Sequence, residues 1–335
     1  MKKSRVTIKE IASEIGVSQS TISRALSGHP AISEQTRTRT LEAARRLNYS
    51  ERGSARKVGA TRMVGVVVAA LHNQFYVHLL DRLHDELRSY GYHMTLIIDS
   101  LSEQEDYSAF EPLVHQYLEG IIVTTASVDS AVVPALKELG IPVVLAVRSI
   151  DGLPFDTVEV DNKVAGQEAA RHLFELGHRR IGFIMGPAET STSRDRHRGA
   201  TEWFEERGVV CEPGLSLWGA FTHASGYSAL ITFLSRPNPP TAVICGNDTI
   251  AIGVIEAARK RGVQIPLQLS VIGFDDIPIA GWEMIQLTTV RQPIAEMAHM
   301  AARRLIERIR SGNEDPPRHD RLPVSLVQRN TTGRV

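Results

Sequence analysis

Short apolar runs of strand length alternate with helix-like segments from about residue 62 to residue 310, and this alternation limits the chain to few folds. Such runs are typical of strands buried in parallel sheets, and alternating strands and helices form crossover units with helices on both sheet faces. The strands are too many for one ordinary sheet, so the pattern predicts two α/β subdomains. The apolar runs are Val64–Ala69, Met94–Ile98, Gly120–Thr124, Val143–Val147, Val158–Val160, Arg180–Met185, Ala242–Cys245 and Val271–Phe274. The predicted helices span about 76–90, 104–118, 130–139, 163–177, 194–207, 224–235, 249–262 and 294–310.

The first 62 residues differ from this body in charge. The 335-residue chain has no net formal charge, but residues 1–62 carry +8 and the remaining 273 residues carry −8. A compact basic segment on an acidic body indicates a polyanionic partner for that segment alone. The alternative is a solvated basic tail, which the helical pattern of the segment disfavours.

The start of the chain predicts three short helices. Thr7-Ile8-Lys9-Glu10 has the form of a capping box, and Gly16 ends the helix that follows it. Ser18 can cap a second helix over Gln19–Leu26, and Ser33 a third helix over about 34–47. Three short helices with a tight turn between the first two are typical of a helix-turn-helix, whose second helix enters the DNA major groove. The expected inward residues are Ile8, Ile11, Ala12, Ile15, Ile22, Ala25, Leu26, Leu41, Ala44 and Leu47.

The outward residues of the second helix suit DNA contacts. Gln19, Ser20 and Thr21 stand at its N-terminus, and Arg24 follows one turn later. Glutamine pairs bidentately with adenine and arginine with guanine, whereas Ser23 is better suited to a phosphate. The alternative is that these are ordinary helix-terminal residues and a solvated charge.

Aromatic and polar residues follow the predicted strands of the body. Ligands of parallel sheets bind outside the carboxyl ends of the strands. Aromatic rings can cover the carbon face of a sugar, while carboxylates and guanidinium groups bind its hydroxyls. Taken singly, Asn247 and Asp248 could be helix caps and Phe221 a core residue. The candidate effector-binding residues are Phe75, Tyr76, Asp161, Thr192, Arg196, Phe221, Asn247 and Asp275.

Sequence signatures of several other protein classes are missing. The chain has no GxxxxGK[ST] loop, no GxGxxG after a strand, no CxxC and no HExxH, and its twelve histidines have no metal-ligand spacing. We therefore expect no enzyme activity, no cofactor and no metal. No apolar run reaches the ~18 residues of a membrane span, and no secretory signal precedes the first helix. Cys211 and Cys245 suit a reducing compartment, so we expect a cytoplasmic protein without a membrane partner.

Motifs along most of the chain resemble those of the lactose-repressor/galactose-repressor (LacI/GalR) family of bacterial transcription regulators. In the headpiece these are VTIKEIA at 6–12, GVS at 16–18, TISRAL at 21–26 and LNY at 47–49. In the body they are NQFY at 73–76, Asp161-Asn162, His172-Leu173, GHRRI at 177–181, Arg196 with Gly199, Asn247-Asp248, SVIGFDD at 270–276 and LTTVRQP at 287–293.

This resemblance implies a hinge helix over residues 50–61, whose apolar residue wedges into the DNA minor groove. Here Ala55 and Arg56 match the family, Val58 replaces the usual leucine, and Gly53 adds flexibility. The resemblance also implies an effector domain with the fold of periplasmic sugar-binding proteins. The expected DNA-binding residues are Thr7, Ser18, Gln19, Ser20, Thr21, Ser23, Arg24, Ala55, Arg56 and Val58. The positions that would contact the effector are Phe75, Tyr76, Thr192, Arg196, Phe221, Asn247 and Asp275.

The sequence as a whole predicts a multidomain protein with an all-α helix-turn-helix headpiece (1–49), a hinge (50–61) and an α/β, periplasmic-binding-protein-like (type I) effector domain (62–335). The N-subdomain would span about 62–160 plus 291–320, and the C-subdomain about 161–290 plus 321–335. The resemblance also implies a homodimer through the effector domain. Tetramer-forming members of the family carry a C-terminal leucine heptad, which the tail Ser311–Val335, with its three prolines, lacks. We expect a repressor that binds a palindromic operator and responds to a sugar-like effector. The alternatives are a cytoplasmic sugar-binding protein without a regulatory role and an α/β enzyme.

Overall fold

The computed structural model describes residues 7–26, 29, 31–47, 61–69, 71, 73–98, 114, 117–127, 140–311 and 315–335. The chain divides into two compact units, Met1–Thr61 and Arg62–Val335. The predicted hinge residues Ala55, Arg56 and Val58 lie outside the described residues, as does the predicted helix at 130–139. The predicted helix at 104–118 also lies mostly outside them, and its last residue, Leu118, begins a strand instead.

The first unit contains the three predicted helices, α1 (Ile8–Ile15), α2 (Gln19–Leu26) and α3 (Glu34–Arg46). The capping box of α1 is present: the backbone N–H of Thr7 donates to the Glu10 carboxylate over 2.6 Å. Gly16 ends α1 with φ 72°, a left-handed conformation that costs glycine little. The three helices pack around a small buried cluster of Ile11, Ala12, Ile22, Ala43 and Ala44.

One core prediction for α3 is wrong. Leu41 is 40% exposed, whereas Thr40 and Ala43 are fully buried and Ala44 nearly so. Residues three and four positions apart share one helix face, so the buried stripe runs through 40, 43 and 44 and leaves Leu41 about 100° away from the stripe. Thr40 can be buried in this stripe although it is polar, because its hydroxyl donates to the Thr36 carbonyl over 2.8 Å.

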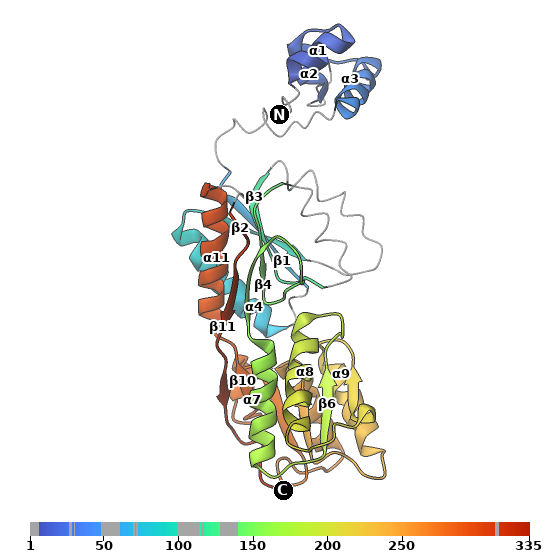
Figure 1. Cartoon of the computed structure of the whole chain (residues 1–335), viewed down its shortest axis with the longest axis vertical. Helices are drawn as coiled ribbons and strands as arrows, with labels where there is room; N and C mark the ends of the chain where they lie inside the picture. Colours follow the sequence, from blue (N-terminus) through green and yellow to red (C-terminus); the bar gives the residue numbers. More distant parts are fainter. Residues whose placement is uncertain are drawn as a thin grey trace. The chain divides into compact units, whose positions relative to one another are not determined.

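The second unit contains two six-stranded sheets with helices around them (Figure 1). All strand pairs are parallel except β10 with β12, which is antiparallel. The first sheet has the order β11-β5-β4-β3-β1-β2 and comprises β1 (Met63–Val68), β2 (His93–Ile98), β3 (Leu118–Val123), β4 (Val143–Ala146), β5 (Asp156–Val160) and β11 (His319–Leu322). The second has the order β12-β10-β9-β8-β6-β7 and comprises β6 (Ile181–Met185), β7 (Ser216–Trp218), β8 (Ala242–Cys245), β9 (Ser270–Asp275), β10 (Thr288–Arg291) and β12 (Ser325–Val327).

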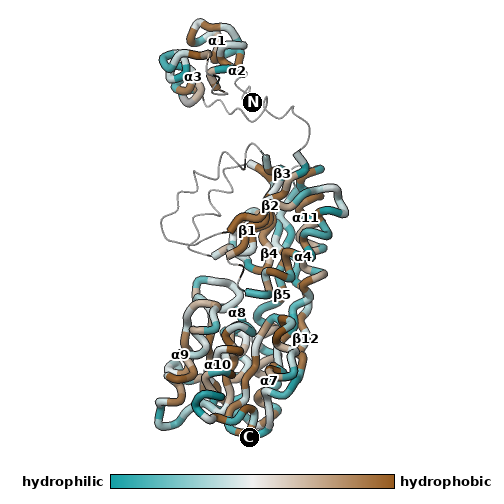
Figure 2. Tube along the Cα trace, turned by 180° about the vertical axis from the view of Figure 1, so that it is seen from behind, coloured by the Kyte–Doolittle hydropathy of each residue, from teal (hydrophilic) through white to brown (hydrophobic). Residues whose placement is uncertain are grey.

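The helices of this unit pack in pairs. Helix α11 (Ile294–Ser311) packs against α4 (Gln74–Ser89) beside the first sheet, as Figure 1 shows. Around the second sheet, α7 (Asn162–Glu175) packs against α8 (Ser191–Glu205), and α9 (His223–Leu234) against α10 (Asp248–Lys260). Two short 3-10 helices, η3 (Pro213–Leu215) and η4 (Pro278–Gly281), complete the set of described helices. Hydrophobic residues run along β1, which is brown in Figure 2 and buried from its second residue onward.

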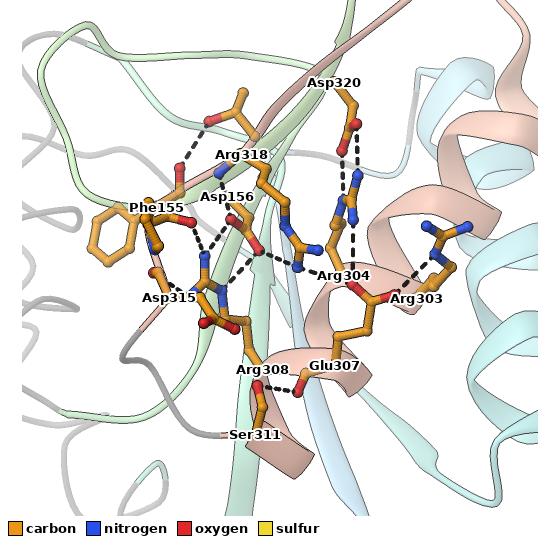
Figure 3. Close-up of polar contacts among 12 residues, drawn as sticks. Phe155, Asp156, Arg303, Arg304, Glu307, Arg308, Ser311, Asp315, Arg318 and Asp320 are labelled. Atoms are coloured by element: carbon orange, nitrogen blue, oxygen red, sulfur yellow. Dashed lines mark hydrogen bonds and ion pairs between the residues drawn. The ribbon is translucent and has the colours of Figure 1, made fainter.

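The chain passes between the two sheets three times. It leaves the first sheet after β5, returns after β10 through α11 and β11, and ends in the second sheet with β12. Two arginine–carboxylate ion pairs hold the segment that returns to the first sheet (Figure 3). Arg308 of α11 donates to both carboxylate oxygens of Asp156 on β5, over 2.9 and 2.7 Å. Arg304, one turn earlier, donates to both carboxylate oxygens of Asp320 on β11, over 2.6 and 2.8 Å.

Two features depart from the predicted strands. Strand β2 is not fully buried, because it lies at the edge of its sheet, where Leu96 and Ile98 remain 39% and 47% exposed. Strands β7, β10, β11 and β12 have only three or four residues and lack the long apolar runs that identified the others. The sequence of β11, for example, is His-Asp-Arg-Leu.

Candidate functional site

A small cavity lies where strands of both sheets end. Its lining residues come from the segments that follow β1, β4, β6, β7, β8 and β10 and from the last residue of β9. They are Asn73, Phe75, Tyr76, Val147, Arg148, Thr192, Arg196, Phe221, Asn247, Asp275 and Gln292.

Helix caps fix several of these side chains. The Asn73 side chain accepts the Phe75 N–H over 3.0 Å at the start of α4, and the Asn247 side chain accepts the Ile250 N–H over 2.9 Å at the start of α10. Both asparagines therefore cap helices and also line the cavity. The sequence allowed the alternative that Asn247 is only a helix cap; in the structure it caps α10 and also lines the cavity. Positive helix N-termini near the cavity favour negative or electron-rich ligand groups.

Arg196 is buried, with 2% of its surface exposed. It donates to the Asn162 side chain over 2.9 Å and to the Gly246 carbonyl over 2.8 Å, and its Nη1 lies 3.6 Å from the Asp275 carboxylate. Burial lowers the pKa of Arg196, an effect that Asp275 opposes. These contacts through Nε and Nη1 hold the guanidinium group in place at the cavity wall.

Asp275 ends β9 with φ 114°, a conformation that non-glycine residues rarely adopt. The Gln292 amide donates to its Oδ1 over 2.6 Å. Burial raises the pKa of Asp275 to about 6, although Arg196 and the Gln292 hydrogen bond lower it. The carboxylate is thus mostly ionised at pH 7 and can accept hydrogen bonds from a ligand.

Asp248 stands behind Asp275 and does not line the cavity. It accepts the Thr289 hydroxyl over 2.6 Å and the Ile277 N–H over 3.0 Å. Complete burial, and then the charge of Asp275, raise its pKa. Asp248 therefore supports β9 and β10 from within and is a structural residue.

Arg148 and Phe221 face each other across the cavity from the two sheets. The guanidinium carbon of Arg148 lies 5.6 Å from the centre of the Phe221 ring, within the distance of a cation–π contact. Phe221 is also held from behind, because a Cβ added to Gly186 would lie 2.3 Å from its ring. Val147, just before Arg148, has φ 73°, which is an outlier for a β-branched residue and costs of order 1–3 kcal/mol.

The structure brings together seven of the eight predicted effector residues, and Asp161 is the exception. Asp161 caps α7 by accepting the Val164 N–H over 3.0 Å and does not line the cavity. Four lining residues were not predicted: Asn73, Val147, Arg148 and Gln292. The rule that ligands bind after strands could have found Arg148, which follows a predicted strand directly.

The predicted DNA-contacting residues lie at the start of α2 in the first unit. Ser18, Gln19, Ser20, Ser23 and Arg24 are exposed, and Thr21 is half-buried. Ser18 caps α2 by accepting the Thr21 N–H over 3.1 Å. An exposed, capped helix N-terminus with glutamine, hydroxyl and arginine side chains can bind both phosphates and base edges. Thr7 is exposed at the start of α1.

Residues 7–51 match the family described as bacterial regulatory proteins, lacI family, and residues 170–332 match a periplasmic binding protein-like domain. The chain is 31% identical over 333 residues to the HTH-type transcriptional regulator DegA of Bacillus subtilis (strain 168), covering 98% of each chain. The chain belongs to the lacI family of bacterial regulatory proteins. It is a DNA-binding transcriptional regulator with a periplasmic-binding-protein-like effector domain, as the family resemblance of its motifs implied.

Solved structures of transcriptional regulators have the same fold. A transcriptional regulator CelR–cellobiose complex matches with a TM-score of 0.76 and 26% identity, over 98% of this chain and all of that one. A LacI family regulator from Enterococcus faecium with bound ribose matches with a TM-score of 0.72 and 25% identity, over 82% of this chain and all of that one.

Two further observations concern other kinds of site in this lacI-family chain. Within the described residues, no three histidine, cysteine, aspartate or glutamate side chains gather as a metal site. None of the described helices is both long and apolar enough to cross a bilayer.

Proposed function

We propose that this protein is a repressor that binds a palindromic operator as a homodimer and is controlled by a sugar or sugar derivative bound in the cavity at the strand ends. The observation that carries the proposal is the combination, in one chain, of a basic helix-turn-helix and a cavity lined by aromatic rings, guanidinium groups and a carboxylate. A repressor of bacterial genes acts in the cytoplasm, and we assign the protein to that compartment.

The cavity residues suit a polyhydroxylated ligand. Phe75, Tyr76 and Phe221 offer rings for the carbon face of a sugar, while Asp275 and Arg196 can bind adjacent hydroxyls. The bound cellobiose and ribose named for two relatives support this ligand class. Predicted residues Thr192 and Asn247 complete the polar wall. Asp161 is left out of the proposed site because it does not line the cavity.

The proposed control acts through the two α/β subdomains, about 62–160 plus 291–320 and about 161–290 plus 321–335. The cavity takes residues from both, so a ligand can favour one relative arrangement of the two subdomains. The Ser149 N–H also donates to the Ser191 hydroxyl over 3.0 Å between them. A ligand changes operator affinity only by its difference in affinity for the two states, typically ~1–3 kcal/mol.

Exposed apolar side chains support a homodimer through the effector domain. Val77 on α4 and Leu96 and Ile98 on edge strand β2 are 45%, 39% and 47% exposed. Clusters of exposed apolar side chains on soluble proteins often mark protein interfaces. A dimer would place two recognition helices on half-sites one helical turn apart, ~34–36 Å. We propose that Gln19, Ser20, Thr21 and Arg24 face base edges there, and that Thr7, Ser18 and Ser23 face phosphates.

The experiment that tests the proposal is a fluorescence-anisotropy titration of the full chain with DNA from upstream of its own gene. Unrelated DNA of equal length is the control, and both are measured at two salt concentrations and with a panel of sugars. We expect preferential binding to the upstream DNA, a steep loss of affinity with salt, and weakening or strengthening by a sugar. Equal, weak binding to both DNAs that no sugar changes would contradict the proposal.

A further inference from the structure

Arg148 is a buried cation without a carboxylate partner among the described residues. It is 6% exposed, and its hydrogen bonds are long ones to two neutral groups, the Thr125 carbonyl over 3.4 Å and the Tyr76 hydroxyl over 3.3 Å. Within the described part of the chain, its Nε has no hydrogen-bond partner. Buried charges in proteins are normally paired, and a buried donor without a partner calls for an explanation.

The other arginine of the cavity shows the contrast. Arg196 donates to Asn162 and Gly246 at normal distances and has Asp275 beside it. Among the described residues that line the cavity, the only carboxylate is that of Asp275, which lies next to Arg196 and accepts a hydrogen bond from Gln292. The described lining residues thus include two guanidinium groups and one carboxylate, and the guanidinium group without a carboxylate beside it is that of Arg148.

The backbone holds Arg148 in this position. It follows β4 directly, after Val147 with its positive φ, and its guanidinium group is directed toward Phe221 of the opposite subdomain. Strained backbone next to a cavity marks residues that the fold positions for binding. A surface arginine would need no such arrangement, because water would solvate it.

We propose that the effector of this regulator carries an anionic group, a carboxylate or a phosphate, and that Arg148 binds that group. The inference rests on the proposed function, since it concerns the same cavity. A guanidinium group binds carboxylate or phosphate with two parallel hydrogen bonds, and Nε is one of the donors that such pairing uses. The aromatic rings, Arg196 and Asp275 remain available for the sugar frame. The ligand class is therefore sugar acids or sugar phosphates rather than neutral sugars.

The test uses the full chain and isothermal titration calorimetry. The probes are glucose, glucuronate and glucose 6-phosphate, and the corresponding three compounds of galactose. Inorganic phosphate is a further probe that does not depend on the sugar, and its binding is measured as the rise in the midpoint of thermal unfolding with phosphate concentration. Arg148→Gln removes the charge. Arg179→Gln is the matched control, because Arg179 also lies over a phenylalanine ring, 3.7 Å from that of Phe174, but outside the cavity.

We expect an anionic probe to bind ~10-fold or more tightly than its neutral counterpart, and Arg148→Gln to remove that preference. Preference for the uronate identifies a carboxylate ligand, and preference for the 6-phosphate identifies a phosphate ligand. We also expect inorganic phosphate to stabilise the wild-type chain and Arg179→Gln in a saturable way, but not Arg148→Gln.

Three results would overturn the inference: a neutral sugar that binds as tightly as its anionic counterparts, an anion preference that survives Arg148→Gln, or no saturable binding of any anion. The anisotropy titration separates this failure from failure of the proposed function. If a neutral sugar changes operator binding, the regulator stands and only the anionic ligand class falls. If no specific DNA binding is found, the proposed function itself fails.

Discussion

Arg308 and Asp156 form a two-point ion pair between residues 152 positions apart in the chain, with both side chains almost completely buried. Asp156 also accepts the backbone N–H of Arg318 over 2.7 Å. Burial alone would raise the pKa of Asp156, but these hydrogen bonds outweigh it and lower the pKa. The pair therefore joins β5 to α11, and the Arg318 hydrogen bond joins β5 to the segment between α11 and β11.

Breaking this pair should destabilise the effector domain strongly. Arg308→Met leaves the Asp156 carboxylate buried with weaker compensation, and removal of one partner of a buried pair costs about 3–5 kcal/mol. Arg303→Met is the matched control, because Arg303 lies on the same helix and its ion pair with Glu307 is solvent-exposed, worth about 0–1 kcal/mol. Urea denaturation followed by tryptophan fluorescence measures both. Equal losses in the two variants would show that the buried pair has no special role.

The close packing of α7 on α8 should couple stability to effector binding. A Cβ added to Gly166 would lie 2.1 Å from the carbonyl oxygen of Arg196, a backbone atom that cannot move aside alone. Gly166→Ala must push apart the helices and shift Arg196, so we expect a loss of about 1–3 kcal/mol and weaker effector binding. Thermal unfolding and calorimetric titration measure the two effects. In Gly219→Ala the nearest atoms lie at an ordinary 3.4 Å, and this control should change neither. Unchanged effector affinity in Gly166→Ala would contradict the coupling.

Much of this architecture could be predicted from the sequence, because buried parallel strands require apolar runs and cavities form where those strands end. Thr192, Arg196 and Asp275 were found in this way. The rule works less well for strands without an apolar run: β10 is Thr-Thr-Val-Arg, so Gln292 after it gave no signal as a cavity residue. Asp161 was selected by the same rule, but its carboxylate caps α7. Position after a strand does not distinguish a helix cap from a ligand-binding group, and only the tertiary structure does.

Histidine burial should make the stability of the effector domain depend on pH. His178 bonds to the hydroxyls of Thr241 and Ser270, each over 2.9 Å, and to the Gly333 carbonyl over 3.0 Å. Burial lowers its pKa, and nearby Arg179 lowers it further, while the Gly333 hydrogen bond opposes this. As the pH falls below about 6.5, the unfolded chain takes up a proton at this histidine while the folded chain does not. The contribution of His178 to the free energy of unfolding is therefore complete above that pH and is lost progressively below it.

The variant His178→Gln isolates this contribution from other titrating groups. We expect its unfolding midpoint to lie below that of the wild type at pH 8, and the gap between the two midpoints to narrow as the pH falls from 7 to 5. Differential scanning calorimetry in buffers of matched ionic strength measures the gap. A gap that stays constant or widens toward pH 5 would mean that His178 is not held neutral.

Operator binding and effector binding should be separable by mutation in the headpiece. Arg24 is exposed on α2, the helix proposed to enter the major groove, so Arg24→Ala should weaken operator binding by about 1–3 kcal/mol and reduce its salt dependence. Effector affinity should not change. Arg261→Ala removes an exposed arginine at the end of α10 and controls for the loss of one positive charge. Anisotropy and calorimetry give the two affinities, and a parallel loss of both in Arg24→Ala would contradict the separation.

The response to the effector should depend on the carboxylate of Asp275. Asp275→Asn preserves the shape of the side chain but replaces one acceptor oxygen by an NH₂ group, which cannot accept a hydrogen bond from a ligand hydroxyl. We expect effector affinity to fall ~10-fold or more, because hydrogen bonds to charged groups are worth about 1.5–3 kcal/mol, and operator binding without effector to persist. The fold should survive, since the substitution also removes a buried charge beside Asp248.

Asp161→Asn is the matched control: asparagine also caps helices, and Asp161 lies outside the cavity. If Asp161→Asn lost the effector response and Asp275→Asn kept it, the ligand would have to bind elsewhere than in the cavity at the strand ends.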